Sequence, residues 1–120
     1  MGNKILIVDD ERPLAKALEL KLTKAGYEAK AVFDGETALG ELETGQYRLI
    51  LLDIIMPSLD GWEILAKIKN LKLSVVVVVT SNLGQGEDID RAKSLGAKEF
   101  LVKSDSTLED IVKKIGSLLT

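Results

Sequence analysis

The sequence predicts an α/β domain in which a five-stranded parallel sheet, of strand order 2-1-3-4-5, is flanked by five helices. Short apolar runs alternate regularly with amphipathic stretches along all 120 residues. Most of these runs are apolar throughout, as is typical of strands buried on both faces. Parallel strands joined by helices form right-handed crossovers, which place helices on both faces of one sheet. We therefore expect five consecutive strand–helix units.

The first unit begins with a strand from Ile5 to Val8, which is followed directly by two aspartates. The next stretch is expected to be helical up to Gly26, and Pro13 suits its first turn. Its apolar residues recur at helical spacing: Leu14, Ala17, Leu18, Leu22 and Ala25. The segment from Tyr27 to Phe33 alternates weakly between small apolar and charged residues, which indicates an edge strand.

Asp34 is expected to cap a second helix, and Gly40 inside that helix costs ~1 kcal/mol relative to alanine. We therefore expect this helix to be the weakest. The run from Leu49 to Leu52 predicts another fully buried strand, which ends in Asp53. A third helix is expected after Asp60, and its apolar residues recur at the right spacing: Ile64, Leu65, Ile68 and Leu71.

The fourth strand is expected from Val75 to Val79, the most β-prone segment of the chain, and it leads into Thr80 and Ser81. The segment from Gly84 to Gly86 predicts a loop. The helix after it begins with acidic residues, which suit the positive end of a helix, and Gly96 ends it.

The fifth strand is expected from Phe100 to Val102, and Lys103 follows it. Ser106 and Glu109 have the spacing of a capping box at the start of the last helix. The apolar residues of that helix form one stripe: Leu108, Ile111, Val112, Ile115 and Leu118.

Composition excludes several classes of protein. The chain is 46% hydrophobic with a net charge of −3, which fits one folded domain over residues 1–120 and argues against a nucleic-acid binder. It contains no cysteine and no histidine, so disulfides, thiol nucleophiles, histidine bases and imidazole metal sites are excluded. The longest apolar run is far shorter than the ~20 residues of a membrane helix. No signal peptide is visible, so we expect a cytoplasmic protein without membrane contact.

Carboxylates follow two strands that are neighbours in the predicted sheet. Asp9 and Asp10 follow the first strand and Asp53 ends the third, and ligand sites in such sheets form at this switch point. A single loop aspartate is most often a turn former or helix cap. Three crowded carboxylates repel one another, and Mg²⁺ prefers such an all-oxygen site. The sequence therefore predicts a Mg²⁺ site here, whereas Asp34 follows an edge strand away from it.

Three further residues are candidates for the same end of the sheet. Lys103 is positioned to reach back over the carboxylates, although most lysines are solvated surface residues. Thr80 can donate a hydroxyl to an anion, or can be an ordinary β-branched strand residue. Phe100 is expected in the core or at its edge beside the site.

These residues resemble the receiver domain of two-component response regulators, a flavodoxin-like, doubly wound fold. The resemblance covers the whole chain and rests on four stretches: Val8-Asp9-Asp10-Glu11, Leu52 to Gly61 with Met56-Pro57 and Asp60, Thr80-Ser81, and Phe100-Leu101-Val102-Lys103. It implies that Asp53 is the phosphate acceptor. It also implies that Asp9, Asp10, Asp53 and the Ile55 carbonyl hold Mg²⁺, that Lys103 pairs with Asp53 or its phosphate, and that Thr80 and Phe100 form a switch pair.

The implied role is a signalling domain that catalyses only its own phosphorylation and dephosphorylation. The donor is expected to be a histidine kinase or phosphotransfer protein, because the chain has no histidine of its own. Phosphorylation is expected to switch the surface of the fourth helix, fifth strand and fifth helix toward a downstream effector. The chain is either a stand-alone protein or the receiver of a longer regulator.

One residue departs from the family pattern. Ser104 follows Lys103 where the family usually has proline, often in a cis bond. A non-proline cis bond costs ~2.5–4 kcal/mol, so we expect a trans bond and a somewhat different turn into the last helix.

Other families with related architecture fit less well. A haloacid-dehalogenase-type phosphatase would need a second aspartate two residues after Asp53, where the chain has Ile55. A flavodoxin-like cofactor binder would need a Ser/Thr-rich phosphate loop after the first strand. Gly84 and Gly86 are too short a match for dinucleotide binding. A purely protein-binding pseudo-receiver would not need the complete acidic set.

Overall fold

The computed structural model describes residues 4–56, 60–82 and 86–119. Pro57 of the central motif and most of the expected loop from Gly84 to Gly86 lie outside these ranges. Within them, five strands pair in parallel in the order β2-β1-β3-β4-β5, which confirms the predicted sheet. The strands are β1 (Lys4–Val8), β2 (Glu28–Val32), β3 (Leu49–Asp53), β4 (Val76–Ser81) and β5 (Glu99–Val102).

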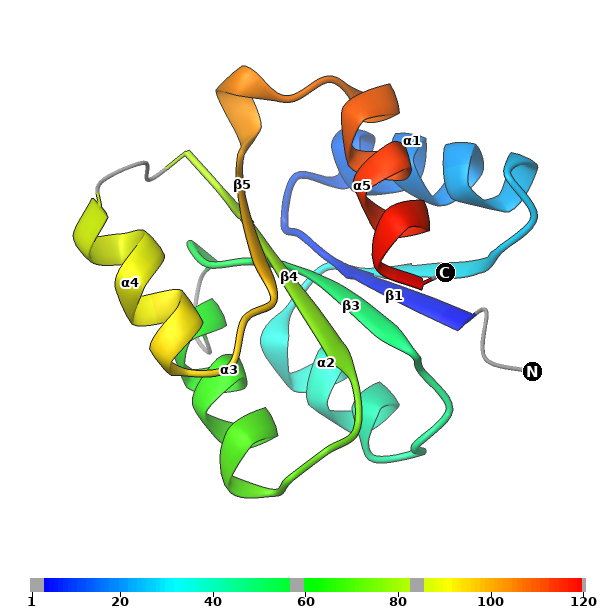
Figure 1. The fold of residues 1–120 in the computed structure, drawn as a ribbon. Coiled ribbons are helices and arrows are strands. Elements are labelled where there is room, and N and C mark those ends of the chain that lie inside the picture. Colours follow the sequence, from blue (N-terminus) through cyan, green and yellow to red (C-terminus); the bar gives the residue numbers. More distant parts are fainter. Residues whose placement is uncertain (1–3, 57–59, 83–85, 120) are drawn as a thin grey trace.

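Helices cover both faces of this sheet. Figure 1 shows α1 and α5 together on one face, and α2, α3 and α4 on the other. The helices are α1 (Arg12–Lys24), α2 (Gly35–Leu42), α3 (Gly61–Asn70), α4 (Gly86–Ser94) and α5 (Leu108–Leu119), and a short 3-10 helix, η1 (Lys103–Asp105), precedes α5. Among the described residues, no helix is both long and apolar enough to span a bilayer.

The core consists of two layers, because successive strand side chains point to opposite faces. Leu6 and Val8 of β1 pack with the α2–α3–α4 side, whereas Ile5 and Ile7 pack with α1 and α5. All five residues of β3 are buried. This burial on both faces explains why the central strands are continuous apolar runs.

The ends of three helices differ from the predictions. Thr107 and Asp110 form the capping box of α5, since each backbone N–H donates to the other side chain at 3.0 Å. The predicted box of Ser106 and Glu109 is wrong by one residue, because the Ser106 hydroxyl instead donates to the Val102 carbonyl. Ala25 and Leu71, expected on buried stripes, are the exposed C-cap residues of α1 and α3.

The turn after β5 agrees with the expectation drawn from Ser104. No peptide bond in the described ranges is cis, so the bond between Lys103 and Ser104 is trans. The chain passes from β5 directly into η1, which precedes α5.

Candidate functional site

The carboxyl ends of the inner strands bring distant polar residues together. Asp9 follows β1, and Asp53 is the last residue of the neighbouring β3. In the sheet register Asp53 is the partner of Thr80, and Thr80 is the partner of Leu101, two residues before Lys103. The topology therefore gathers residues 9, 53, 80 and 103 at one edge of the sheet.

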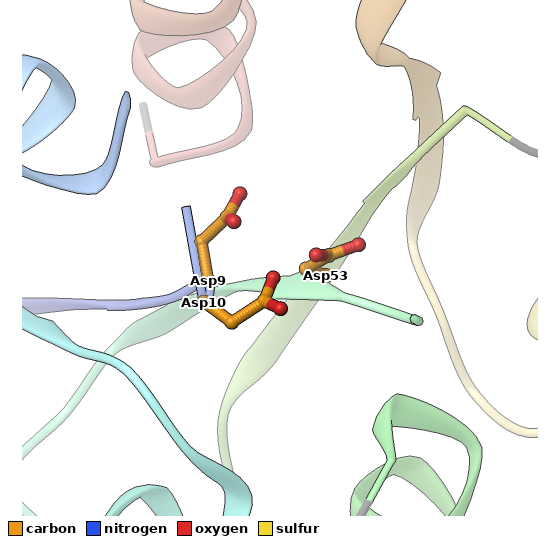
Figure 2. Close-up of side chains that lie close together, drawn as sticks. All are labelled: Asp9, Asp10 and Asp53. Atoms are coloured by element: carbon orange, nitrogen blue, oxygen red, sulfur yellow. The ribbon is translucent and has the colours of Figure 1, made fainter. Parts of the chain in front are cut away.

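Asp9, Asp10 and Asp53 form a tight acidic cluster. One carboxylate oxygen from each lies within 4.8 Å of the others. Figure 2 shows the three side chains projecting from the ends of β1 and β3. Asp9 and Asp53 are buried and Asp10 is exposed, so the cluster opens toward solvent on the Asp10 side.

The donor chemistry of this cluster fits a hard divalent cation. Carboxylate oxygens are the preferred ligands of Mg²⁺, which binds through one or two carboxylates and keeps several waters. Three carboxylates at this separation also repel one another unless a cation neutralises them. The cluster can thus hold a metal ion.

Lys103 supplies a cation to the cluster. Its Nζ lies 2.8 Å from Asp9 Oδ2, 2.9 Å from Glu11 Oε1 and 3.2 Å from Asp53 Oδ2. Burial alone would lower the pKa of Lys103, but the hydrogen bonds to Asp9 and Glu11 and the charge of Asp53 outweigh it. The pKa of Lys103 is therefore raised, and the ammonium stays charged throughout the physiological range.

Asp53 ionises less readily than an ordinary aspartate. Its pKa is raised to about 6, mainly by burial and also by the neighbouring charge of Asp9, although Lys103 acts in the opposite direction. The 3.2 Å ion pair by itself would suggest a lowered pKa. The raised value is physically consistent, because Lys103 is shared among three acids while Asp53 is almost fully buried. Asp53 is still about nine-tenths ionised at pH 7.

Backbone contacts fix the turns that carry the acids. Asp9 Oδ1 accepts a hydrogen bond from the Glu11 N–H at 2.9 Å, which orients the turn between β1 and α1. The Ile55 N–H donates to Asp53 Oδ1 at 3.3 Å. Each acid at a strand end is thus tied to the residue two positions later.

Gly61 allows α3 to approach the end of β3 closely. Its N–H donates to the Ile54 carbonyl at 2.8 Å. A Cβ atom at this position would lie 2.4 Å from the Asp53 carbonyl oxygen and 2.5 Å from Ile54 Cα. Both are backbone atoms, so only glycine fits without moving the segment that carries Asp53.

A pocket of about 390 Å³ opens over the cluster. Its lining consists of Asp10, Glu11, Asp53, Ile55, Ser81, Asn82 and Lys103. The pocket presents three carboxylates, an ammonium group, a hydroxyl and an amide around one opening. Such a set can bind a cation together with a small anion.

The two candidate switch residues lie in different surroundings. Thr80 is buried beside Asp53, at the carboxyl end of β4. Phe100 is partly buried and packs with the core on the α2–α3–α4 side, outside the lining of the pocket. The structure thus brings Thr80 to the acidic cluster and leaves Phe100 three residues before Lys103, on the sheet face opposite α1 and α5.

Two residues of the site were not singled out from the sequence. The sequence places Glu11 in the motif after the first strand and near the start of the first helix, but its contact with Lys103 depends on a side-chain conformation that no local pattern encodes. Gly61 was read as a helix start, and its close approach to Asp53 becomes visible only when α3 is packed against β3. Glycine directly after the capping Asp60 was the one available signal.

Comparison with known proteins gives a consistent result. The sequence model described as "Response regulator receiver domain" matches residues 5–116. The response regulator ArlR of Staphylococcus aureus is 33% identical over 118 residues, which are 97% of this chain and 52% of ArlR. The chain therefore spans about half the length of the curated relatives it matches.

Solved structures agree with this match. A two-component response regulator from Clostridium difficile has a TM-score of 0.90 at 28% identity and covers 98% of this chain and 95% of its own. The receiver domain of the Francisella response regulator 1452 has a TM-score of 0.91 at 25% identity, with 98% and 97% covered.

Proposed function

This chain belongs to the response regulator receiver domain family, and we therefore propose that its Asp53 accepts a phosphoryl group from a partner protein. The observation that carries the proposal is the position of the Asp53 carboxylate. It lies in an open pocket, beside two further acids and 3.2 Å from the ammonium group of Lys103, whose side chain is 10% exposed. Phosphoryl acceptance is the general function of this family.

The reaction is a displacement at phosphorus. An Asp53 carboxylate oxygen forms a bond to phosphorus while the bond between phosphorus and the donor's imidazole nitrogen breaks, and its electron pair leaves with the imidazole. The product is an acyl phosphate on Asp53. No general base is needed, because the nucleophile is ionised at neutral pH. The chain has no histidine, so the phosphohistidine lies outside these 120 residues.

We assign Asp9, Asp10, Asp53 and the Ile55 backbone carbonyl as the groups that hold Mg²⁺. When bound, Mg²⁺ would neutralise charge on the transferring phosphoryl group. The separation of the three carboxylates supports this assignment. Asp53 would thus be both a ligand and the nucleophile.

Lys103 is assigned to the phosphorylated form. Its ammonium already contacts Asp53 and Asp9, so phosphoryl oxygens added to Asp53 lie within its reach. The new anion gives Lys103 a stronger partner than the carboxylate alone. This differential contact is a source of free energy for a conformational change.

The switch is assigned to Thr80 and Phe100. Thr80 is the register partner of Asp53, and its hydroxyl is proposed to donate to the phosphate. Phe100 is one residue from the partner of Thr80 on β5. Movement of Thr80 toward the phosphate would vacate space near β5 for the Phe100 ring. The surface of α4, β5 and α5 would then change and be recognised by an effector.

The cellular setting follows from the same premise. The donor is proposed to be a histidine kinase or phosphotransfer protein, and the output a downstream domain or protein. The chain is proposed to act in the cytoplasm and to catalyse only its own phosphorylation and dephosphorylation. Neither nucleic acid nor membrane is expected to contact this domain directly.

The proposal is tested by incubating the protein with a small phosphodonor such as phosphoramidate, with and without Mg²⁺, and measuring intact mass. Wild-type protein and the Asp34→Asn control should gain one phosphate only when Mg²⁺ is present. Asp53→Asn should gain none. A protein-binding pseudo-receiver, in contrast, would gain no phosphate in any variant, and that result would contradict the proposal.

A further inference from the structure

The Lys103 ammonium group lies within ion-pair distance of three carboxylates, and its hydrogen bond to Glu11 is 2.9 Å long. An ammonium group has three N–H donors, and Lys103 Nζ contacts one oxygen each of Asp9, Glu11 and Asp53. The contacts to Asp9 and Glu11, at 2.8 and 2.9 Å, are shorter than the 3.2 Å contact to Asp53. Phosphorylation converts the Asp53 carboxylate into an acyl phosphate, so the contact to Asp53 can pass directly to a phosphoryl oxygen. A phosphate that takes a second of the three donors must displace Asp9 or Glu11.

The three acceptors differ in how easily water can replace the lysine. The side chains of Asp9 and Asp53 are 3% and 5% exposed, whereas that of Glu11 is 57% exposed. A buried carboxylate without its cation is costly, but an exposed one is re-solvated at little cost. Glu11 is therefore the acceptor that Lys103 can leave.

Nothing else in the described structure requires the Glu11 side chain at this place. Glu11 is the N-cap residue of α1, yet its side chain makes no capping hydrogen bond. Its backbone N–H is held by Asp9 Oδ1, which positions the side chain toward Lys103 across the mouth of the pocket. Instead, the Glu11 carboxylate accepts a hydrogen bond from Lys103 Nζ.

We propose that Glu11 is a positioning residue that competes with the phosphoryl group for Lys103. In the unphosphorylated protein Glu11 holds one donor of the ammonium group, and on phosphorylation it releases that donor to the phosphate. This inference rests on the proposed function of Asp53. Glu11 therefore slows the phosphorylation of Asp53. This effect depends on its contact with Lys103 and not only on its negative charge.

Two substitutions separate contact from charge. Glu11→Gln removes the negative charge, which would also reduce repulsion of an anionic phosphodonor. Glu11→Asp keeps the charge but shortens the side chain by one methylene, and aspartate at an N-cap position is drawn to the helix N–H groups. Glu109→Gln is the matched control, because Glu109 is 73% exposed and pairs with Lys21 at 3.9 Å, outside the pocket.

The measurement is the rate constant of phosphorylation by phosphoramidate at fixed Mg²⁺, followed by intact mass. An exposed ion pair of this kind corresponds to roughly a two- to fivefold effect, so we expect that increase in both Glu11 variants and none in Glu109→Gln. An increase in Glu11→Gln alone would show that only charge matters and would overturn the proposal. No increase in either variant would also overturn it.

A spectroscopic signal tests the release itself. In wild-type protein the ¹³C resonance of the Glu11 carboxylate should shift on phosphorylation, whereas that of Glu109 should not. An unchanged Glu11 resonance in fully phosphorylated protein would contradict the exchange. Failure of the underlying function is distinguishable, because wild-type protein would then take up no phosphate at all.

Discussion

The Lys103 ammonium lies 3.2 Å from the Asp53 carboxylate, and yet the pKa of Asp53 is raised to about 6. Burial of Asp53 outweighs the attraction, because the same ammonium also neutralises Asp9 and Glu11. The ionised, buried Asp53 therefore lowers the free energy of unfolding.

Asp53→Asn is expected to stabilise the protein at pH 7. The pKa of Asp53 is about 6 in the folded protein, whereas the ordinary aspartate value of 3.8 applies in the unfolded chain. Folding therefore favours the protonated form. The contribution of Asp53 to the free energy of unfolding is fully present below its unfolded pKa of 3.8 and is lost as pH rises through 6. The difference is worth about 3 kcal/mol at pH 7, since one pKa unit corresponds to about 1.4 kcal/mol.

Denaturant unfolding of wild-type protein and Asp53→Asn at pH 7 and pH 4, without Mg²⁺, measures this effect. The gain in unfolding free energy should be present at pH 7 and be largely absent at pH 4. A variant that is less stable than wild type at pH 7 would show that the ion pair with Lys103 outweighs burial.

Asp10→Asn is expected to weaken Mg²⁺ binding, and Asp34→Asn is not. Asp10 belongs to the acidic cluster, whereas Asp34 caps α2 by accepting the Thr37 N–H at 2.8 Å. Asparagine caps helices as well as aspartate, so the control retains its fold while losing the same charge. Isothermal titration with Mg²⁺ provides the comparison, and equal affinities in the two variants would contradict the assigned site.

Lys103→Ala is expected to impair switching more than acceptance of phosphate. The acidic cluster remains available to Mg²⁺, so Asp53 can still attack a reactive donor. The substitution removes the cation whose contact with position 53 is stronger in the phosphorylated than in the unphosphorylated protein. Amide NMR shifts around Phe100 and Lys114 should therefore change less on phosphorylation than in wild type.

The unmodified Lys103→Ala protein is also expected to be less stable. The side chain of Lys103 is 10% exposed, and its removal leaves two buried carboxylates without a cation. Breaking buried pairs in this way costs roughly 3 kcal/mol. If the variant accepted no phosphate even at saturating Mg²⁺, Lys103 would instead act mainly in the transfer step.

Two glycine-to-alanine substitutions are expected to have opposite effects. At Gly61 the added Cβ would lie 2.4 Å from the Asp53 carbonyl oxygen, so Gly61→Ala should destabilise the protein and lower its rate of phosphorylation. At Gly40, within α2, the Cβ would have no atom within 4 Å, so Gly40→Ala should stabilise by about 1 kcal/mol. Thermal unfolding of both variants is the measurement, and a stable, normally phosphorylated Gly61→Ala would contradict the close approach.

Much of the fold was predictable because the central strands are buried on both faces. Uninterrupted apolar runs such as Ile5 to Val8 indicate burial on both faces. The parallel topology alone then places the acids that follow these runs at one edge of the sheet. The details at helix ends were less predictable. Ser106 and Thr107 have the same capping chemistry, and only the exit direction from η1 selects Thr107.

The site was predictable where it depends on strand ends and unpredictable where it depends on packing. Asp9, Asp53 and Thr80 follow from strand order and register. The sharing of Lys103 with Glu11 depends on a turn held by the Asp9 side chain, and the need for glycine at position 61 depends on contact between α3 and β3. Glu11 and Lys103 are 92 residues apart, and the approach of Gly61 to Asp53 depends on how α3 packs on β3, so local patterns describe neither contact.

The central claim, that Asp53 carries the phosphoryl group, is tested most directly by locating the modification. Protein phosphorylated by phosphoramidate in the presence of Mg²⁺ is reduced with borohydride, which converts an aspartyl phosphate into homoserine, and its peptides are sequenced by mass spectrometry. We predict homoserine at position 53 and unmodified aspartate at positions 9, 10 and 34. Homoserine at position 9 or 10, or a stable phosphate on a serine or threonine, would contradict the account.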